Sequence, residues 1–328
     1  MADTADVLPG LAESFPVVEH FRNGRFFNPG VAEHDFRTAL KWMRNRKIGP
    51  WRPWIDATPG APPPLQIEGS ALRATFVNHS TVLLQTGGLN ILTDPVWSRR
   101  VSPVQFAGPE RHRAPGIRFE DLPPIHLLLI SHNHYDHFDA PTLKRLAAAH
   151  RPVVFCPLGL RIPLRRLGFS DAHELDWGQS QPWQSLRIHC TQAQHFAART
   201  PWDRNRTLWC GWLLESQHGN LYFAGDTGFC GAFAALHERF PSIRLALLPI
   251  GAYDPEWFMG PVHMTPEQAV RARELLDAAT AIAIHFGTFA LADDGEAEPL
   301  ERLQRALEGR STGERFWVLS EGEGRMVP

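Results

Sequence analysis

The chain has 328 residues, of which 43% are hydrophobic and 21% are charged, so it has the composition of an ordinary globular protein. Its formal net charge of −2 reflects no excess of basic residues, which argues against a dedicated nucleic-acid-binding protein. No apolar run approaches the ~18 residues that a membrane-spanning helix needs, and the acidic N-terminus has no signal-peptide core.

The first 65 residues differ in pattern from the rest of the chain. They are mostly irregular, with a Trp- and Pro-rich stretch at 51–64, and a helical pattern is present only at 34–45. The high aromatic content favours an extension packed on the core over a flexible linker. We therefore expect an N-terminal extension over residues 1–65 and one folded domain over residues 66–328.

The middle of the chain combines short strands with helices. Gly87-Gly88 is the expected turn in a β-meander, and Asp139 is an expected helix N-cap. The predicted elements are strands at 74–78, 81–85, 89–93 and 125–130, a helix at 142–150, an apolar run at 153–156, a basic amphipathic stretch at 159–167 and a strand at 185–191.

The C-terminal part repeats this alternation. Thr265 to Gln268 has capping-box spacing and opens a helix that runs to about residue 279. The predicted strands are a hairpin at 211–215 and 220–224, a buried strand at 245–250, and strands at 281–285 and 316–319, the last of which ends the series. Two β-rich halves, each followed by helices, predict two sheets packed face to face with helices outside.

A dense set of metal-ligand residues follows the apolar run 125–130. Residues 131–137 read Ser-His-Asn-His-Tyr-Asp-His, and imidazole and carboxylate are the ligands that zinc and similar metals prefer. A single histidine is usually a packed or surface residue, but four such groups within six positions favour a metal site. His132 and His134 point the same way in an extended stretch, whereas Asp136 and His137 continue past the bend. The segment can therefore serve two metals.

Three further residues that could bind a metal lie at the ends of other predicted strands. His195 follows the strand at 185–191, Asp226 follows the strand at 220–224, and His285 ends the strand at 281–285. An aspartate in a Gly-Asp-Thr-Gly sequence is by itself more often a turn residue. Three such residues at strand ends, where sheets gather their sites, favour a shared metal centre.

These motifs resemble the metallo-β-lactamase superfamily and, more narrowly, its N-acylphosphatidylethanolamine-hydrolysing phospholipase D group. The resemblance covers roughly residues 70–295 and is carried by residues 92–96, 129–137, 251–259 and 283–289. It departs where Asn78-His79-Ser80 replaces Gly-His-Ala and where Phe286 replaces a common Trp. The resemblance implies an α/β fold of the αββα four-layer type, with two mixed sheets flanked by helices.

The resemblance also implies a ligand set for two divalent metal ions, which zinc, manganese or iron can supply. One ion takes His132, His134 and His195, the other takes Asp136, His137 and His285, and Asp226 bridges them. Two such ions can share a water, lower its pKa toward ~7 and stabilise charge on a phosphoryl group. We therefore expect Asp136 and Asp226 to be catalytic, with a metal-bridging hydroxide attacking a phosphodiester.

Other residues are candidates for supporting roles. Asp94 is expected to hydrogen-bond a ligand histidine, or else to be a loop residue before a proline. His263, just before the helix opened by Thr265, is expected to contact the substrate phosphate or donate a proton, with a structural role as the alternative. His79 is expected to line the site, or else to be a satisfied core histidine.

Four large side chains in a predicted loop bear on the substrate. Tyr253, Trp257, Phe258 and Met259 form either an apolar wall for an acyl chain or ordinary buried packing. The leading hypothesis is therefore a phospholipase D-type phosphodiesterase acting on N-acylphosphatidylethanolamine-like lipids. The main alternative keeps the metals but has a small soluble substrate such as a sugar-phosphate lactone. A non-catalytic binding protein is disfavoured because every expected ligand is present.

The remaining expectations concern partners and location. The four cysteines show no C-x-x-C spacing, which predicts free thiols and a cytoplasmic protein. The partner is expected to be a phospholipid or another phosphodiester, with peripheral membrane contact through a basic loop over residues 99–118 as an option. The sequence is compatible with either a monomer or an oligomer.

Overall fold

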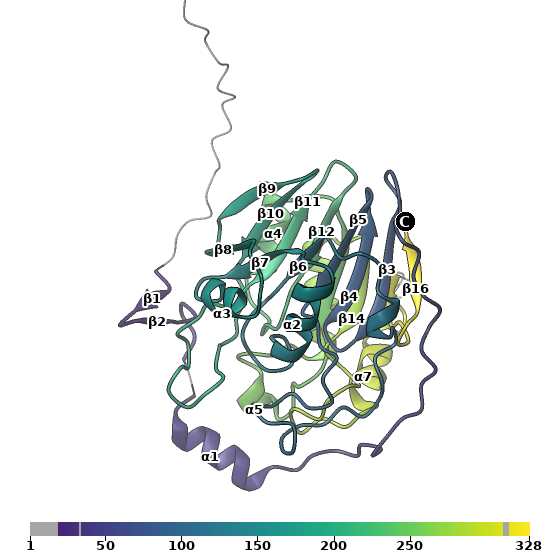
Figure 1. The fold of residues 1–328 in the computed structure, drawn as a ribbon. Coiled ribbons are helices and arrows are strands. Elements are labelled where there is room, and N and C mark those ends of the chain that lie inside the picture. The colour runs from purple at the N-terminus through teal and green to yellow at the C-terminus, as the bar shows by residue number, and fades with distance from the viewer. Residues whose placement is uncertain (1–18, 33, 311–314) are drawn as a thin grey trace, which may run out of the picture.

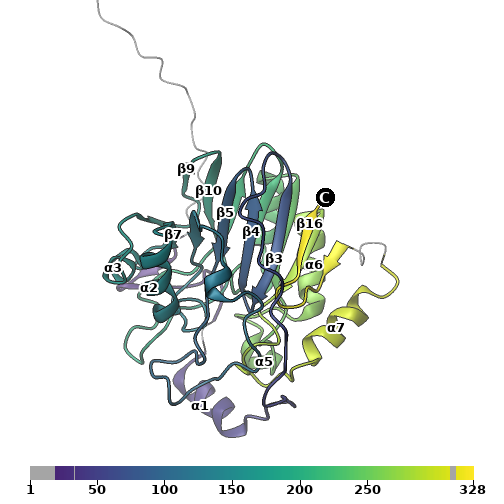
Figure 2. The same cartoon turned by 45° about the vertical axis from the view of Figure 1, so that its right-hand side comes forward.

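The computed structural model describes residues 19–32, 34–310 and 315–328 (Figure 1). Two seven-stranded mixed sheets pack face to face, and helices cover both outer faces (Figure 2). The predicted α/β class and αββα layering are confirmed. Within the described residues, none of the helices has the length and apolar character needed to cross a membrane.

The first sheet contains the strand that precedes the histidine-rich segment. Its order is β16 (Gly324–Val327), β3 (Leu72–Asn78), β4 (Thr81–Thr86), β5 (Leu89–Thr93), β6 (Leu127–Leu129), β7 (Val153–Pro157) and β8 (Ala172–Leu175). Its first four strands pair antiparallel, and the pairs from β5 to β8 are parallel. Helices α2 (Ala140–Ala149) and α3 (Arg161–Arg166) cover its outer face, with a 3-10 turn η1 (Phe119–Asp121) in the preceding loop.

The second sheet supplies the other strand ends. Its order is β15 (Phe316–Trp317), β14 (Thr280–Ile284), β13 (Ile243–Pro249), β12 (Asn220–Phe223), β11 (Gly211–Glu215), β10 (Leu186–Thr191) and β9 (Ser180–Trp183). Helix α6 (Pro266–Leu276) packs on β13 at its outer side, and α4 (Ala232–Arg239) and α7 (Glu298–Leu307) both contact α6. The N-terminal part contributes β1 (Phe21–Arg22), β2 (Arg25–Phe26) and α1 (Phe36–Asn45).

The continuous apolar run around β6 follows from burial on both faces of its sheet. Leu127 and Leu129 pack into the core between the sheets, whereas Leu128 and Ile130 pack into the core under α2. Side chains of a strand alternate between its two faces, so a strand covered on both sides needs apolar residues at every position. This packing fixes the point at which residues 131–137 leave the sheet.

Several predicted boundaries are confirmed and others are wrong. Thr265 and Gln268 form the predicted capping box, but α6 ends at Leu276 because Asp277 adopts the left-handed conformation, with φ of 47°. Residues 316–319 do not hold the last strand, because β16 follows and pairs with β3. Asp139 is the N-cap residue of α2, but its carboxylate accepts from the backbone of the 97–98 loop instead of capping the helix.

Hydrogen bonds attach the N-terminal segment to the rest of the fold on both sides of α1 (Phe36–Asn45). At one end, Asn28 Nδ2 donates to the carbonyl of His195, at 2.7 Å. At the other, Arg46 pairs with Asp293, at 3.1 Å, and the Gly49 N–H donates to the Asp293 carbonyl, at 2.7 Å. Between these attachments, α1 lies beside the short helix α5 (Glu256–Met259), as both views show (Figures 1 and 2). Residues 1–18 of the expected extension lie outside the described residues.

The loop that holds this segment contains a buried carboxyl group with a testable pH effect. Asp294 Oδ2 accepts from the Ala252 N–H, at 3.1 Å, and Oδ1 is buried with no hydrogen-bond partner among the described residues. Burial raises the pKa of Asp294 to about 6. Its carboxyl in an unfolded chain has a pKa of about 3.9, so the folded state binds more protons between these values. Stability from this group is present below about pH 4 and is lost as pH rises toward 6.

We therefore expect Asp294→Asn to raise the thermal unfolding temperature at pH 7, because the amide needs no ionisation. The gain in unfolding free energy is limited to about 3 kcal/mol by the size of the pKa shift. Thermal unfolding followed by circular dichroism at pH 7 and at pH 4 measures it. The gain is expected to disappear at pH 4, and an equal gain at both pH values would contradict the assignment.

Candidate metal centre

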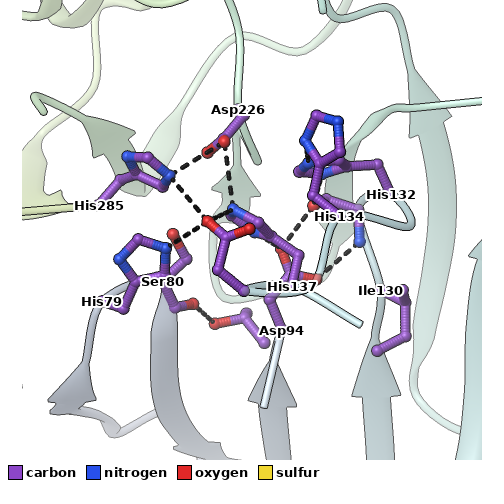
Figure 3. A network of polar contacts seen from close by, with 12 residues as sticks. His79, Ser80, Asp94, Ile130, His132, His134, His137, Asp226 and His285 are labelled. Carbon is purple, nitrogen blue, oxygen red and sulfur yellow. Dashed lines mark hydrogen bonds and ion pairs between the residues drawn. The ribbon is translucent and has the colours of Figure 1, made fainter. Parts of the chain in front are cut away.

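The seven predicted ligand residues lie together, and each comes from the end of a strand. Figure 3 shows His132, His134 and His137 from the loop after β6 facing Asp226 and His285. Asp226 follows β12, His285 follows β14, and His195 follows β10. The strands thus deliver ligands from both sheets to one edge of the sandwich.

Three imidazoles form what we call the first ligand group: His132, His134 and His195. His132 Nε2 lies 2.8 Å from His134 Nδ1, which lies 3.2 Å from His195 Nε2. The outer nitrogens have other partners, since His195 Nδ1 donates to the carbonyl of Val262 at 2.9 Å and His132 Nδ1 contacts Ser131 Oγ at 2.9 Å. Three nitrogens consequently converge on one point.

What we call the second ligand group consists of Asp136, His137 and His285, and His79 offers a further potential ligand atom close to theirs. Asp136 Oδ2 lies 3.1 Å from His137 Nε2 and 3.4 Å from His285 Nε2. Asp94 accepts from His137 Nδ1 at 2.7 Å and from the Ser131 N–H at 2.7 Å. This contact fixes the tautomer of His137, so that its Nε2 faces the group without a proton when a metal is bound.

Asp226 lies between the two groups. Its Oδ2 is 3.1 Å from His137 Nε2, 3.0 Å from His285 Nε2 and 3.8 Å from His195 Nε2. One carboxylate therefore reaches nitrogens of both groups, which is the arrangement a ligand shared by two cations requires.

Burial and charge indicate whether these residues fit metal ions. Asp226 Oδ1 is buried without a hydrogen-bond partner among the described residues, and His285 Nε2 makes no well-directed hydrogen bond despite its short distance to Asp226. Leaving such groups unsatisfied costs about 1–3 kcal/mol each. Divalent cations would satisfy them, and imidazole with carboxylate is a suitable donor set. The residues fit two metal ions.

The two groups differ in their electrostatics. Burial lowers the pKa of His134 to about 4 and also lowers that of His132. For His285, burial acts in the same direction, but the charges of Asp226 and Asp136 outweigh it and raise the pKa to about 9. The imidazoles of the first group are therefore neutral at pH 7, whereas the positive charge on the imidazoles of the second group is balanced by the carboxylates of Asp136 and Asp226.

A cavity of about 370 Å³ opens onto this centre. Its polar floor includes His134, Asp136, Asp226, His263 and His285. Its walls are largely apolar and come from four separate stretches of the chain: Val31, Ala39, Trp42, Phe196, Phe258, Met259, Leu291 and Ala292. A ligand with an apolar part next to a polar reacting group matches this division.

Two of the four residues predicted to form an apolar wall lie at the cavity and two do not. Phe258 and Met259 line the cavity. Tyr253 does not, because it is buried elsewhere and donates its hydroxyl to Glu298 at 2.9 Å. Trp257 does not either, because it is 51% exposed beside Lys41. The prediction of a loop was wrong here, since α5 turns consecutive side chains to different sides.

The two remaining predicted substrate contacts lie in different places. His263 is in the polar floor of the cavity, and its Nδ1 has no partner among the described residues. Burial lowers the pKa of His263 to about 3, so the imidazole is neutral at pH 7. His79 is not part of the cavity lining. It is a buried residue whose Nε2 lies 2.9 Å from Asp136 Oδ2.

Sequence reasoning missed the contribution of the N-terminal segment. Trp42 and Ala39 line the cavity, and Asn28 supports the segment that carries His195. Nothing in the local sequence marks these residues, because their contacts are with residues far along the chain. By contrast, Ser131 adjoins the histidine cluster, and its position could have indicated its bonds to Asp94 and His132.

Comparisons with known proteins agree with this geometry. The protein-family model described as "Beta-lactamase superfamily domain" matches residues 89–286 of this chain. N-acyl-phosphatidylethanolamine-hydrolyzing phospholipase D 1 of Caenorhabditis elegans is 38% identical over 74% of this chain and 71% of that protein. The mitochondrial N-acyl-phosphatidylethanolamine-hydrolyzing phospholipase D of Saccharomyces cerevisiae is 33% identical over 71% of this chain and 51% of that protein.

A solved structure supports the fold. Igni18, a metallo hydrolase from Ignicoccus hospitalis, has a TM-score of 0.60 and 22% identity to this chain, covering 79% of this chain and 99% of its own. The chain therefore belongs to the beta-lactamase superfamily and is a metal-dependent hydrolase of the metallo-β-lactamase fold.

Proposed function

We propose that this chain is a phospholipase D-type phosphodiesterase that holds two divalent metal ions and acts on N-acylphosphatidylethanolamine-like lipids. The observation that carries this proposal is the cavity, whose floor holds the ligand residues and whose walls are apolar. A phosphodiester lipid has the matching division, with a charged reacting group next to a hydrocarbon chain. The names of the two curated relatives add support.

Different residues in the cavity floor would bind the two metal ions. The first ligand group would hold one ion, the second would hold the other, and Asp226 would contact both. When bound, two such ions supply Lewis-acid stabilisation of phosphoryl charge and lower the pKa of water. Zinc, manganese and iron all suit these ligands.

His263 would contact the substrate phosphate. It lies in the cavity floor within reach of the ligand residues, with its ring centroid 5.0 Å from that of His195 and 5.3 Å from that of His285. A neutral imidazole can donate one N–H to a phosphate oxygen without repelling the metal ions. His263 is thereby assigned to binding and orientation of the phosphate.

Phe258 would form the rigid part of the acyl-chain wall. Its ring stacks on both sides, 4.8 Å from His34 and 4.9 Å from Trp42, each at an interplanar angle of 19°. Such packing holds an apolar surface in place before a ligand arrives, which lowers the entropic cost of binding. The wall joins α1 to α5 across the cavity.

We expect Phe258→Ala to lower kcat/KM for long-chain N-acylphosphatidylethanolamine in detergent micelles about 10- to 100-fold, because burial of one phenyl ring contributes about 1.5–3 kcal/mol. The expected loss for bis-p-nitrophenyl phosphate, which has no acyl chain, is much smaller. Trp257→Ala is the matched control, since its ring is adjacent in sequence but outside the cavity lining. Equal losses on both substrates would contradict an acyl-chain role.

The same metal-loaded wild-type protein also separates the proposal from its alternative. Turnover of the long-chain lipid and of a sugar-phosphate lactone is measured side by side. Lipid hydrolysis that releases phosphatidic acid and N-acylethanolamine is the expected result. Efficient turnover of the lactone together with no lipid hydrolysis would overturn the lipid proposal.

Peripheral membrane contact would involve α1 rather than the basic loop. Arg99 and Arg100 both pair with Glu110, and Arg118 pairs with Asp121, so this loop is largely neutralised by its own carboxylates. On α1, Leu40 is 40% exposed and Met43 is 52% exposed. These two residues, i and i+3 along the helix, lie on one side and can enter a lipid surface.

We expect the Leu40→Glu/Met43→Glu double variant to bind anionic phospholipid vesicles at least about tenfold more weakly than the wild type. Vesicle co-sedimentation measures this binding. Hydrolysis of bis-p-nitrophenyl phosphate should remain unchanged, because neither side chain lines the cavity. Unchanged vesicle binding by the double variant would remove α1 from the membrane-facing surface.

A further inference from the structure

His79 lies in the turn between β3 and β4 and has an unusual backbone conformation. Its φ of 49° lies in the left-handed region that non-glycine residues rarely adopt. Its side chain is 2% exposed and points into the sandwich toward the second ligand group (Figure 3). A turn that only reverses the chain needs neither this backbone conformation nor a buried ring, so the contacts that His79 makes indicate its role.

His79 makes three hydrogen bonds with the second ligand group or with the loop that follows His285. Nε2 contacts Asp136 Oδ2 at 2.9 Å. The carbonyl accepts from the His285 N–H at 2.8 Å, and the N–H donates to Thr288 Oγ1 at 3.0 Å. The side chain therefore contacts one ligand of the group, and the backbone contacts another.

The direction of the side-chain hydrogen bond follows from the ring's surroundings. Nδ1 of His79 is buried with no hydrogen-bond partner among the described residues, and Asp136 Oδ2 can only accept when ionised. The proton consequently sits on Nε2, which donates it to the carboxylate. A carboxylate that is free to rotate can turn its oxygen away from a metal, and a fixed donor prevents this.

We propose that His79 is a positioning residue for the second metal site, where its Nε2–H holds the carboxylate of Asp136 toward His137 and His285. The inference rests on the two-metal site proposed above. A purely structural histidine would stabilise the fold without distinguishing the two ions. A positioning residue changes the affinity of the second ion and leaves the first unaffected, because no hydrogen bond of His79 reaches His132, His134 or His195 among those described.

The test compares two variants of similar size. His79→Leu fills the space without a donor, whereas His79→Gln places an amide N–H near the position of Nε2. Full-length protein is titrated with Zn²⁺ against a competing chelator, which gives a dissociation constant for each of two ions, and the unfolding temperature of the metal-free protein is recorded. The leucine variant is expected to bind the second ion about 10- to 100-fold more weakly, with the first unchanged. The glutamine variant is expected to recover most of that affinity.

His189→Ala is the matched control. His189 is another buried imidazole, and its Nε2 contacts Glu215 at 2.8 Å, away from the ligand residues. This variant is expected to lose stability while both zinc affinities remain at the wild-type value. Should the leucine variant fail to fold, His79→Asn replaces it, because its polar side chain is too short to reach Asp136 from this backbone.

The outcomes separate this inference from the proposed function. Wild-type protein that binds two ions, together with a leucine or asparagine variant that binds both as tightly, would overturn the positioning role alone. An equal weakening of both ions would also overturn it, since that result describes a general loss of structure. Wild-type protein that binds fewer than two ions would overturn the two-metal site and this inference with it.

Discussion

Replacing Asp226 with asparagine is expected to lower kcat for phosphodiester hydrolysis roughly 10³-fold while the fold is retained. Its Oδ2 lies near nitrogens of both ligand groups, at 3.0 Å from His285 and 3.8 Å from His195. The amide has nearly the same shape, but it has no negative charge and offers one oxygen in place of two. Metal ions contribute several kcal/mol of transition-state stabilisation, and each 1.4 kcal/mol corresponds to a tenfold change in rate.

The measurement combines steady-state kinetics on bis-p-nitrophenyl phosphate with metal analysis and circular dichroism. Asp294→Asn is the matched control, because it makes the same substitution at a buried aspartate outside the cavity lining and is expected to turn over at the wild-type rate. Near-normal turnover by Asp226→Asn with two ions bound would contradict a shared ligand at this position. Loss of the native circular dichroism spectrum would instead assign Asp226 to folding.

The ligand residues could be predicted from sequence because two local rules apply to them. His132 and His134 are close in sequence, and alternation along an extended segment gives them the same direction. His285 and Asp226 follow apolar runs that are recognisable as buried strands, and strands of packed sheets end at common edges. The sequence therefore predicted which side chains meet, without specifying the distances between them.

The cavity walls could not be predicted, because they depend on contacts between distant segments. Trp42 and Phe258 are more than 200 residues apart in sequence, yet their rings stack at 4.9 Å. Aromatic residues in a Pro-rich segment indicate packing in general, but they do not indicate the partner. Tyr253 was predicted to line the wall but does not, because its hydroxyl donates to Glu298 in α7. This contact depends on the packing of α7 and cannot be recognised from the sequence around Tyr253.

Edge strands and the role of His79 were missed for related reasons. β16 reads Gly-Arg-Met-Val, and its Arg325 and Met326 are exposed, so it has no continuous apolar run and is recognisable only by its pairing with β3. His79 stood out by its residue type alone, which is compatible with cavity lining, core packing or support of a ligand. Its contact with Asp136, 57 positions along the chain, decides between these roles.

Removal of metal is expected to abolish hydrolysis and to lower the unfolding temperature, because the ligand residues are buried together and Asp226 Oδ1 and His285 Nε2 have no hydrogen-bond partner in the described part of the chain. Purified protein is treated with a chelator, dialysed and analysed for metal before and after treatment. We expect about two equivalents of metal per chain before treatment and none after it. An ion present at a thousandfold excess over its dissociation constant stabilises the folded state by about 4 kcal/mol per site, so the unfolding temperature should fall clearly.

Restoring single metals then identifies which ions the centre uses. Zn²⁺, Mn²⁺ and Fe²⁺ are added separately, and both activity and unfolding temperature are expected to recover with at least one of them. Ca²⁺ is the control, because it prefers six to eight oxygen ligands and the centre offers five imidazoles and two carboxylates. Activity that recovers fully at one equivalent, or that persists after verified removal, would contradict a two-metal mechanism. Recovery that reaches its limit only at two equivalents would assign the second ligand group, and not the first alone, to catalysis.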